Sequence, residues 1–374
     1  MSISKVEIIN VRHVHGSDFN RAWAETFPGT SVVESTYPLV ILDTDDGLTG
    51  VGAGMEYCNE LEVTVRRLEK YLLGKDPFDV ARIGNLLAQS SRQYGTYLGC
   101  VDVALWDLIG KKCGQPIYKV LGAYSDRVRP YASLGQLRSP QETVETVRRM
   151  RSEGYSAFKI RFHTMKPEDE LEVIQALRQE FGDSIDIMVD ANQAHPEADH
   201  VWTFSTALKI ARALEKLNVY YFEEPWHMDD LHGYRRLADA VDIPISGGED
   251  EYNPERFRDS LDAYDIVQPD VSITGITAGK KIGSMAELKH KLCIPHAWSG
   301  GGIGLAANLQ LIGSLSNCPF VEFPYDPPAW SIEVRDRFLK SPIVPKDGFV
   351  KIPDKPGIGV EIDWDKLRAS TADW

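Results

Sequence analysis

Short apolar runs alternate along most of this chain with longer segments in which apolar residues recur every three or four positions. Runs of four to eight apolar residues bounded by polar ones predict buried strands, and the longer segments predict helices. The predicted strands lie at 129–133, 156–162, 185–190, 219–224, 243–249, 265–270, 292–296 and 319–322. The helices between them are predicted from Ser139 onward and then at 167–182, 198–217, 228–240, 253–262, 275–289 and 303–316.

Eight strand–helix periods are typical of an α/β fold of the (β/α)₈ TIM-like barrel type, with 127–342 as the barrel. A doubly wound open sheet is the alternative. Before this region, residues 1–12 alternate as a strand, Asp46-Gly47 marks a hairpin, and 60–125 are helical in pattern. The sequence therefore predicts an α+β first domain over 1–126, and a tail, 343–374, that packs back on it.

Residues 13–35 interrupt the strand pattern of the first domain with glycine, proline, asparagine and several aromatic residues. A polar loop of this length is uncommon in a compact domain and often acts as a lid over a site. An ordinary surface loop is the alternative. His13 and His15 lie two positions apart at its start and are expected to point outward, unless they fall over a pocket.

Composition narrows the possible partners. The chain has 374 residues, of which 43% are hydrophobic, and a net charge of −14 from 41 basic and 55 acidic residues. Without a basic run, nucleic acids and anionic membranes are poor partners. Five scattered cysteines suggest a reducing compartment, and neither a signal-peptide core nor a run of membrane-spanning length is visible. We expect a cytoplasmic protein.

Three consecutive strands of the predicted barrel end in a carboxylate. Asp190, Glu223 and Glu249 are separated by 33 and 26 residues, which is room for one helix and its loops between neighbouring parallel strands. Because such strands lie about 4.8 Å apart, the three acids should form a dense negative arc. A hard divalent cation, Mg²⁺, is the expected counter-ion. The alternative is that each acid caps the helix that follows it.

Most other predicted strands also end in a charged or titratable residue. Lys159 and Arg161 are two apart and should both point into the barrel mouth, where mutual repulsion would lower the lysine pKa; ordinary neutralisation of carboxylates is the alternative. Asp270 and His296 end neighbouring strands, so the aspartate can fix the imidazole tautomer. Glu322 ends the eighth strand.

These residues suit the removal of a proton next to a carboxylate. In such a reaction Mg²⁺ neutralises the substrate carboxylate and a base takes the α-proton. The enediolate that develops is then stabilised by the metal, by Lys159 or Arg161, and by a protonated Glu322.

The chain resembles the mandelate racemase-like branch of the enolase superfamily over essentially its whole length. The motifs that carry the resemblance are 104–122 (Ala-Leu-Trp-Asp-Leu-Ile-Gly-Lys-Lys to Gly122), Val189-Asp-Ala-Asn192, Phe222-Glu-Glu-Pro225, Gly248-Glu249, Gln268-Pro-Asp270 and Pro295-His296. The resemblance implies that the first domain caps the barrel and that the loop 13–35, with the turn near Gly52–Glu56, covers the site. It also implies metal ligands (Asp190, Glu223, Glu249), a catalytic dyad (Asp270, His296), and substrate contacts that we expect at Asn192, Trp298 and Trp23.

One departure from the family matters. The second-strand motif of the family reads Lys-x-Lys, with the second lysine as a base, but here that position is Arg161, which is effectively always protonated. A racemase needs a base on each face of the α-carbon. Since His296 is the one convincing base, the sequence favours a one-base reaction, and the resemblance implies dehydration of a sugar acid to a 2-keto-3-deoxy acid. Lys159 could still supply a second base.

Three other functions stay open from sequence. A racemase or epimerase, and a lactone cycloisomerase, would use the same enolate chemistry. The third alternative is not an enzyme: a protein that binds a sugar acid without turnover, suggested by Arg161. The resemblance also implies a homo-oligomer, because relatives commonly assemble.

Overall fold

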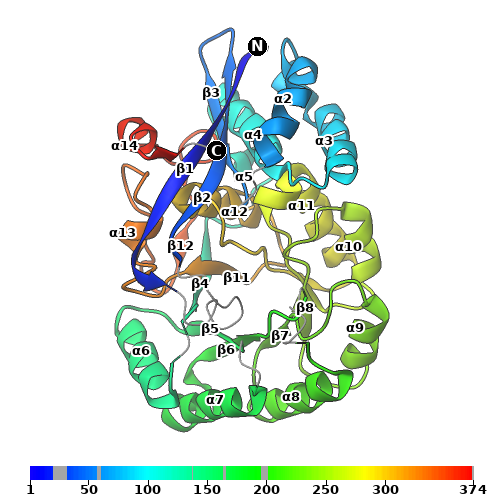
Figure 1. Cartoon of the computed structure of the whole chain (residues 1–374), viewed down its shortest axis with the longest axis vertical. Helices are drawn as coiled ribbons and strands as arrows, with labels where there is room; N and C mark the ends of the chain where they lie inside the picture. The colour runs from blue at the N-terminus through cyan, green and yellow to red at the C-terminus, as the bar shows by residue number, and fades with distance from the viewer. Residues whose placement is uncertain (20–31, 57–59, 137, 163–165, 195–200, 373–374) are drawn as a thin grey trace.

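The computed structural model describes residues 1–19, 32–56, 60–136, 138–162, 166–194 and 201–372 (Figure 1). The described strands form two sheets, one antiparallel and one largely parallel. Figure 1 shows the antiparallel sheet and its helices in the upper half of the view, above the ring of helices that surrounds the parallel strands. No described helix is long and apolar enough to cross a membrane.

The antiparallel sheet, called the capping sheet here, has the order β13-β1-β2-β3. Its strands are β1 (Ile3–Phe19), β2 (Val32–Thr44), β3 (Thr49–Ala53) and β13 (Thr371–Ala372). The hairpin predicted at Asp46-Gly47 joins β2 to β3, and Gly47 takes the positive φ of 83° that this turn needs.

The boundaries predicted for the interruption in this sheet were wrong. We expected the first strand to end at residue 12, but β1 runs to Phe19 and pairs with β2, with His13 opposite Ser35. This pairing continues to Val14 and resumes at Phe19 after an irregularity. Backbone pairing of this kind can continue past the apolar pattern, because it does not depend on side-chain chemistry. The middle of the predicted lid, 20–31, lies outside the described residues.

A group of helices follows β3 in the chain: α2 (Glu60–Leu72), η1 (Pro77–Asp79), α3 (Val80–Tyr94), α4 (Gly99–Cys113) and α5 (Ile117–Val120). Of this group, α2 and α4 pack on the capping sheet. Helix α4 packs on β3 so closely that a Cβ at Gly52 would lie 2.0 Å from the carbonyl oxygen of Cys100. Only glycine permits this approach, which fixes α4 against the sheet.

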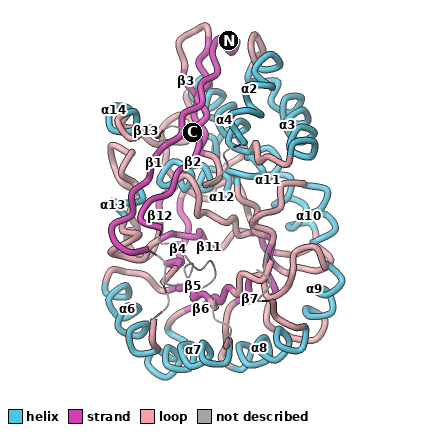
Figure 2. Tube along the Cα trace, viewed as in Figure 1, coloured by secondary structure: helices cyan, strands magenta, loops and turns pink. Residues whose placement is uncertain are grey.

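The second sheet contains eight parallel strands in the order β10-β9-β8-β7-β6-β5-β4-β11. It curls as in the TIM-like barrel predicted from sequence, and Figure 2 shows its strands inside a ring of helices. The strands are β4 (Arg127–Ser133), β5 (Ala157–Arg161), β6 (Asp186–Asp190), β7 (Tyr221–Glu223), β8 (Ile245–Gly247), β9 (Ile266–Val267), β10 (Leu292–Cys293) and β11 (Phe320–Pro324).

The surrounding helices follow the predicted pattern. They are α6 (Pro140–Ser152), α7 (Pro167–Phe181), η2 (Gly182–Ser184), α8 (Phe204–Lys216), α9 (Leu231–Ala238), α10 (Pro254–Ser260), α11 (Val271–Leu288) and α12 (Gly301–Ile312). Ser139 caps α6, and Glu142 completes a capping box with it. Helix α8 begins later than expected because Thr203 caps it by accepting a hydrogen bond from the Thr206 amide.

Apolar side chains fill the barrel below the strand ends, so the barrel is a packed core rather than a channel. This layer contains Tyr131, Ala157, Met188, Tyr221, Ile266, Ile294 and Phe320, all buried. Polar chemistry is therefore confined to the layer above it, at the carboxyl ends of the strands.

The end of the chain touches both sheets. After α13 (Ile332–Arg335), β12 (Val350–Lys351) pairs with β4 of the barrel, and β13 pairs with β1 of the capping sheet. Between them, α14 (Trp364–Arg368) places Arg368 3.0 Å from Glu7 on β1. Figure 1 marks the N-terminus beside the capping sheet.

Candidate active site

The parallel register places the predicted strand-end residues at one level. Arg161 pairs with Asp190, and Asp190 pairs with Glu223, across β5, β6 and β7. Glu249 follows β8 by two residues and lies in the loop that the strand feeds. All of these positions belong to the carboxyl ends of the strands, where barrel enzymes hold their reacting groups.

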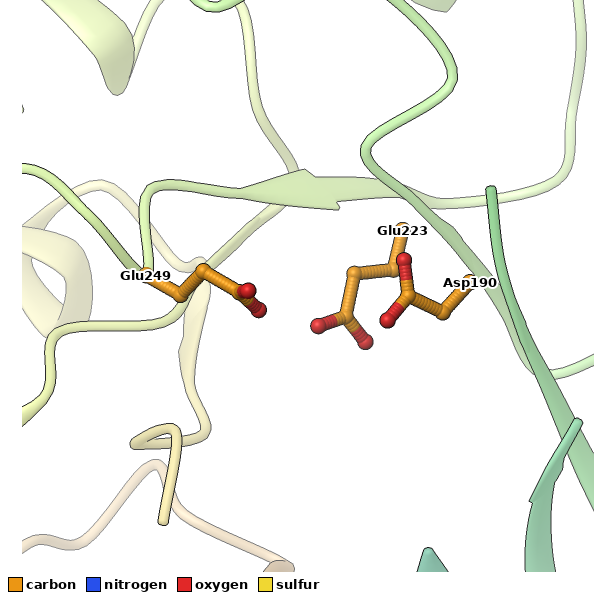
Figure 3. Close-up of side chains that lie close together, drawn as sticks. All are labelled: Asp190, Glu223 and Glu249. Atoms are coloured by element: carbon orange, nitrogen blue, oxygen red, sulfur yellow. The ribbon is translucent and has the colours of Figure 1, made fainter. Parts of the chain in front are cut away.

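Asp190, Glu223 and Glu249, called the carboxylate cluster here, converge as Figure 3 shows. One oxygen atom of each residue lies within 4.8 Å of those of the other two. Asp190 and Glu223 are fully buried, and the buried Oε2 of Glu249 has no hydrogen-bond partner among the described residues. Three hard oxygen donors around one point, one of them unsatisfied, fit a divalent cation such as Mg²⁺.

Lys159 lies at the centre of a buried ion-pair network. Its Nζ is 2.9 Å from Glu223, 2.8 Å from Glu322 and 3.7 Å from Asp190. Burial and Arg161 both act to lower the pKa of Lys159, but the three carboxylates outweigh them and raise it well above its ordinary value. The expectation of a lowered lysine pKa was therefore wrong, because it counted the neighbouring cation and omitted the anions from three other strands.

Arg161 is held on several sides. Its Nη1 donates to Asp190 Oδ2 at 2.7 Å and to Asn192 Oδ1 at 3.0 Å. Its guanidinium carbon lies 5.1 Å from the ring centroid of Trp298. This planar cation cannot lose its proton, and the stacking and forked contacts fix its orientation.

The predicted dyad is formed. The Nδ1 atom of His296 lies 2.9 Å from Oδ2 of Asp270, and the other oxygen of Asp270 accepts hydrogen bonds from the Ser272 amide and hydroxyl. Because the carboxylate accepts, Nδ1 carries the hydrogen and Nε2 is left to exchange a proton. Nε2 lies 3.7 Å from Glu249 Oε2 and 3.8 Å from Glu322 Oε2.

Opposing effects set the charge of His296. Burial alone would lower the pKa of the imidazole, but the charges of Glu249 and Glu322 and the hydrogen bond to Asp270 outweigh it. The pKa rises to about 10.

Glu322 was expected to be protonated, and the structure contradicts this. Burial acts to raise its pKa, but Lys159, His296 and Arg161 hold it well below its ordinary value, so the side chain is a carboxylate. Its Oε1 also accepts a hydrogen bond of 2.7 Å from Ser133 Oγ. An ionised Glu322 can orient cations but cannot donate a hydrogen bond.

Ser133 is a site residue that the sequence analysis missed. It is the last residue of β4, so with it all eight barrel strands contribute a polar side chain at or near their carboxyl ends. Its position in the sequence could have identified it, because Ser133 ends its strand as Asp190 and Glu223 end theirs.

His13 was expected to point outward, but it is 1% exposed. Its ring stacks on Trp330, with centroids 5.3 Å apart, and Trp330 in turn lies 5.0 Å from Trp298. The rings of His13, Trp330 and Trp298 therefore form a row of contacts that leads from β1 to the guanidinium group of Arg161. Strand alternation alone could not predict this, because the aromatic partners come from loops near the end of the barrel sequence.

The substrate contacts expected at Asn192, Trp298 and Trp23 stay predictions. Asn192 and Trp298 both contact Arg161, whereas Trp23 lies outside the described residues. The turn near Gly52–Glu56 meets the loop after β10, where Ser299 Oγ lies 2.9 Å from Met55 Sδ. In that turn, burial raises the pKa of Glu56 to about 7.

Comparisons with known proteins agree with this architecture. Residues 142–366 match the family model described as enolase C-terminal domain-like. Residues 19–122 match the model of the mandelate racemase/muconate lactonizing enzyme N-terminal domain. Together the two models span most of the chain.

Individual relatives are sugar-acid enzymes by name. The chain is 34% identical to an arabinonate dehydratase of Saccharolobus solfataricus, over 86% of this chain and 87% of the relative. It is 30% identical to a D-galactarolactone cycloisomerase of Agrobacterium fabrum, over 88% and 89%. Among solved structures, the 3,6-anhydro-D-galactonate cycloisomerase of Zobellia galactanivorans superposes with a TM-score of 0.84 at 28% identity, over the full length of both chains.

Proposed function

Because the chain belongs to the mandelate racemase/muconate lactonizing enzyme family of the enolase superfamily, we propose that it is a Mg²⁺-dependent dehydratase of a sugar acid. The observation that carries the proposal is a difference in proton exchange between the two sides of the site: the pKa of His296, about 10, depends on the charge of Glu249, a proposed metal ligand, whereas carboxylates fix the cations opposite it in their charged forms. One side offers His296, a titratable base oriented by Asp270. The other offers Lys159 and Arg161, both held in their charged forms.

The carboxylate cluster is the proposed metal site, with Asp190, Glu223 and Glu249 as ligands. When bound, Mg²⁺ would supply positive charge for the substrate carboxylate and for the developing enediolate. It would also neutralise the charge of Glu249, which raises the pKa of His296, and so make His296 a better base near neutral pH. Lys159 and Arg161 add fixed positive charge on the side of β5.

The proton transfers are assigned to His296. Its Nε2 takes the α-proton of the substrate, while Asp270 holds Nδ1 and stabilises the imidazolium that forms. The imidazolium then returns that proton to the β-hydroxyl as the carbon–oxygen bond breaks. Water leaves, an enol remains, and its tautomerisation gives the 2-keto-3-deoxy acid, so one residue serves as base and then as acid.

A lactone cycloisomerase is the second candidate, favoured by the cycloisomerases among the similar proteins. It would use the same α-proton chemistry without loss of water. Racemisation is less favoured, because a second base would have to be Lys159, and the carboxylates around it raise its pKa. Binding without turnover is also less favoured, since the dyad and the carboxylate cluster are both assembled.

The proposal is tested by a 2-keto-acid assay over a library of monoacid and diacid sugars, with Mg²⁺ and with EDTA. We expect at least one sugar acid to yield a keto acid with Mg²⁺ and none with EDTA. A library without any keto-acid product would overturn dehydration. Activity that persists in EDTA would overturn the metal assignment.

A further inference from the structure

Helix α11 begins with a break that lies close to the dyad. The helix spans Val271–Leu288, but Gly275 inside it has non-helical angles, φ 76° and ψ 167°. A single turn, residues 271–274, therefore precedes a main helix that restarts at Ile276. Each of these two segments has its own helix start, with backbone N–H groups that need acceptors.

The first turn is capped by the dyad aspartate itself. Asp270 is its N-cap, and Oδ1 accepts hydrogen bonds of 2.8 Å from the Ser272 amide and from its hydroxyl. The position of Asp270 Oδ2, which holds His296, therefore depends on where the turn 271–274 lies.

The second start has no cap of its own, because Gly275 has no side chain. A carboxylate from a different part of the chain takes this role. Asp102, in the first turn of α4, accepts hydrogen bonds from the Thr277 amide at 2.8 Å and from the Thr277 hydroxyl at 2.6 Å. Asp102 is only 3% exposed. A buried carboxylate at a helix start satisfies the amides and the positive end of the helix dipole.

Backbone packing leaves the turn little freedom to move. A Cβ at Gly275 would lie 2.7 Å from the Cβ of Asp102, and a Cβ at Gly99 would lie 2.4 Å from the Val271 carbonyl oxygen. Helix α4 therefore contacts the turn 271–275 at both of its ends. Figure 1 shows α4 beside α11, between the capping sheet and the barrel.

We propose that Asp102, on the helix that packs against the capping sheet, is a positioning residue for the dyad. It fixes the break at Gly275 and thereby the turn that carries Asp270, which in turn orients His296. No contact between Asp102 and a substrate is involved. The consequence for turnover rests on the proposed function, whereas the effect on the His296–Asp270 hydrogen bond does not.

The direct test is NMR of protein labelled with ¹⁵N-histidine, without substrate. The proton on Nδ1 of His296 is assigned by its loss in His296→Asn. We expect Asp102→Ala to shift or abolish this resonance, because the turn that carries Asp270 loses its support. Asp102→Asn keeps one acceptor and should have a smaller effect of the same kind, and it decides the question if the alanine variant does not fold.

Trp106→Phe is the matched control. Trp106 lies on α4 and donates to the same Thr277 hydroxyl at 2.9 Å, but it does not cap the restarting helix. It should leave the His296 resonance unchanged. A resonance unchanged in Asp102→Asn, or moved equally by Trp106→Phe, would overturn the proposal.

Kinetics give a second readout once a substrate is known. Asp102→Asn should lower kcat roughly tenfold, since small misplacements of a catalytic group slow the reaction strongly, and leave KM within about twofold. The same substitution in a His296→Asn background should have no further effect, because Asp102 acts through the dyad. If the sugar-acid library shows no turnover, the NMR result still decides this proposal.

Discussion

At the scale of single residues, charge in the site is set by neighbours from other strands. Lys159 is charged because Glu223, Glu322 and Asp190 surround it, and Glu322 is ionised for the reciprocal reason. His296 is held by Asp270 at Nδ1, so Nε2 is the position where it exchanges a proton, and the charges of Glu249 and Glu322 outweigh burial and raise its pKa to about 10. Predictions at this scale therefore concern which residue exchanges a proton.

Replacement of His296 by asparagine should abolish turnover. Asparagine can still donate to Asp270 but cannot take a proton, so we expect a loss of roughly 10³-fold in kcat. Mg²⁺ affinity, measured by calorimetry, should stay near normal because the carboxylate cluster is untouched. Retained turnover would remove His296 as the base.

Replacement of Arg161 by lysine should not create a racemase. The new lysine would lie beside Asp190 and Glu322, the carboxylates that face Arg161 now, and they should hold it charged. We therefore expect no C2 epimer when reaction mixtures are separated by chromatography. An epimer formed by this variant and not by the wild-type protein would show that the lysine acts as a second base.

The strand-end acids were predictable from sequence because each terminates an apolar run, and parallel strands bring such ends to one level. The charge states of Lys159 and Glu322 were not predictable, since they depend on distances across the barrel. Burial of His13 also required knowledge of Trp330, which is far away in sequence.

At the scale of elements, the strands and helices of the barrel follow the periodic pattern closely. The main part of α11 restarts next to residue 275, where a helix was predicted, but the preceding turn and the break were not foreseen. The break depends on Asp102, which lies on a helix of the other half of the chain.

Asp107 on α4 should be a strong contributor to stability. It is fully buried and accepts hydrogen bonds from the amides of Val51 on β3 and Ile358 in the tail, at 3.0 and 2.8 Å. Asp107→Ala leaves both amides unpaired, so we expect a loss of about 2–4 kcal/mol in urea unfolding.

Asp46→Ala is the control for Asp107→Ala. It removes the surface pair with Lys112 and should cost less than about 1 kcal/mol. Equal losses in the two variants would contradict the role assigned to Asp107.

Glu7 should make the contact between β1 and α14 sensitive to acid. Hydrogen bonds from Arg368 and Lys5 lower its pKa from the ordinary 4.5 to about 2. A depressed pKa adds stability above pH 4.5 that is lost as the pH falls toward 2. Because the pair is partly exposed, we expect a contribution of about 1 kcal/mol.

Comparison of Glu7→Gln with the wild-type protein isolates this contribution from the other carboxylates. In urea unfolding, the wild-type protein should be more stable at pH 6, and the difference should vanish near pH 2. A difference that does not change with pH would mean that the ion pair does not stabilise this contact.

At the scale of the whole molecule, the capping sheet with its helices contacts the barrel at several places, two of them next to the dyad in sequence. The tail pairs with β4 and with β1, the turn near Gly52–Glu56 contacts the loop after His296, and α4 supports the turn that carries Asp270. The substrate is therefore expected to bind where both halves contribute side chains, and its identity depends on both.

The most direct test of one-base dehydration is the reaction of the identified substrate in D₂O with Mg²⁺, followed by ¹H NMR. With a single base at His296, the product should be a 2-keto-3-deoxy acid that carries deuterium at C3, and no C2 epimer should accumulate. A C2 epimer that carries deuterium, formed without any keto acid, would contradict the account and establish chemistry on both faces of the α-carbon.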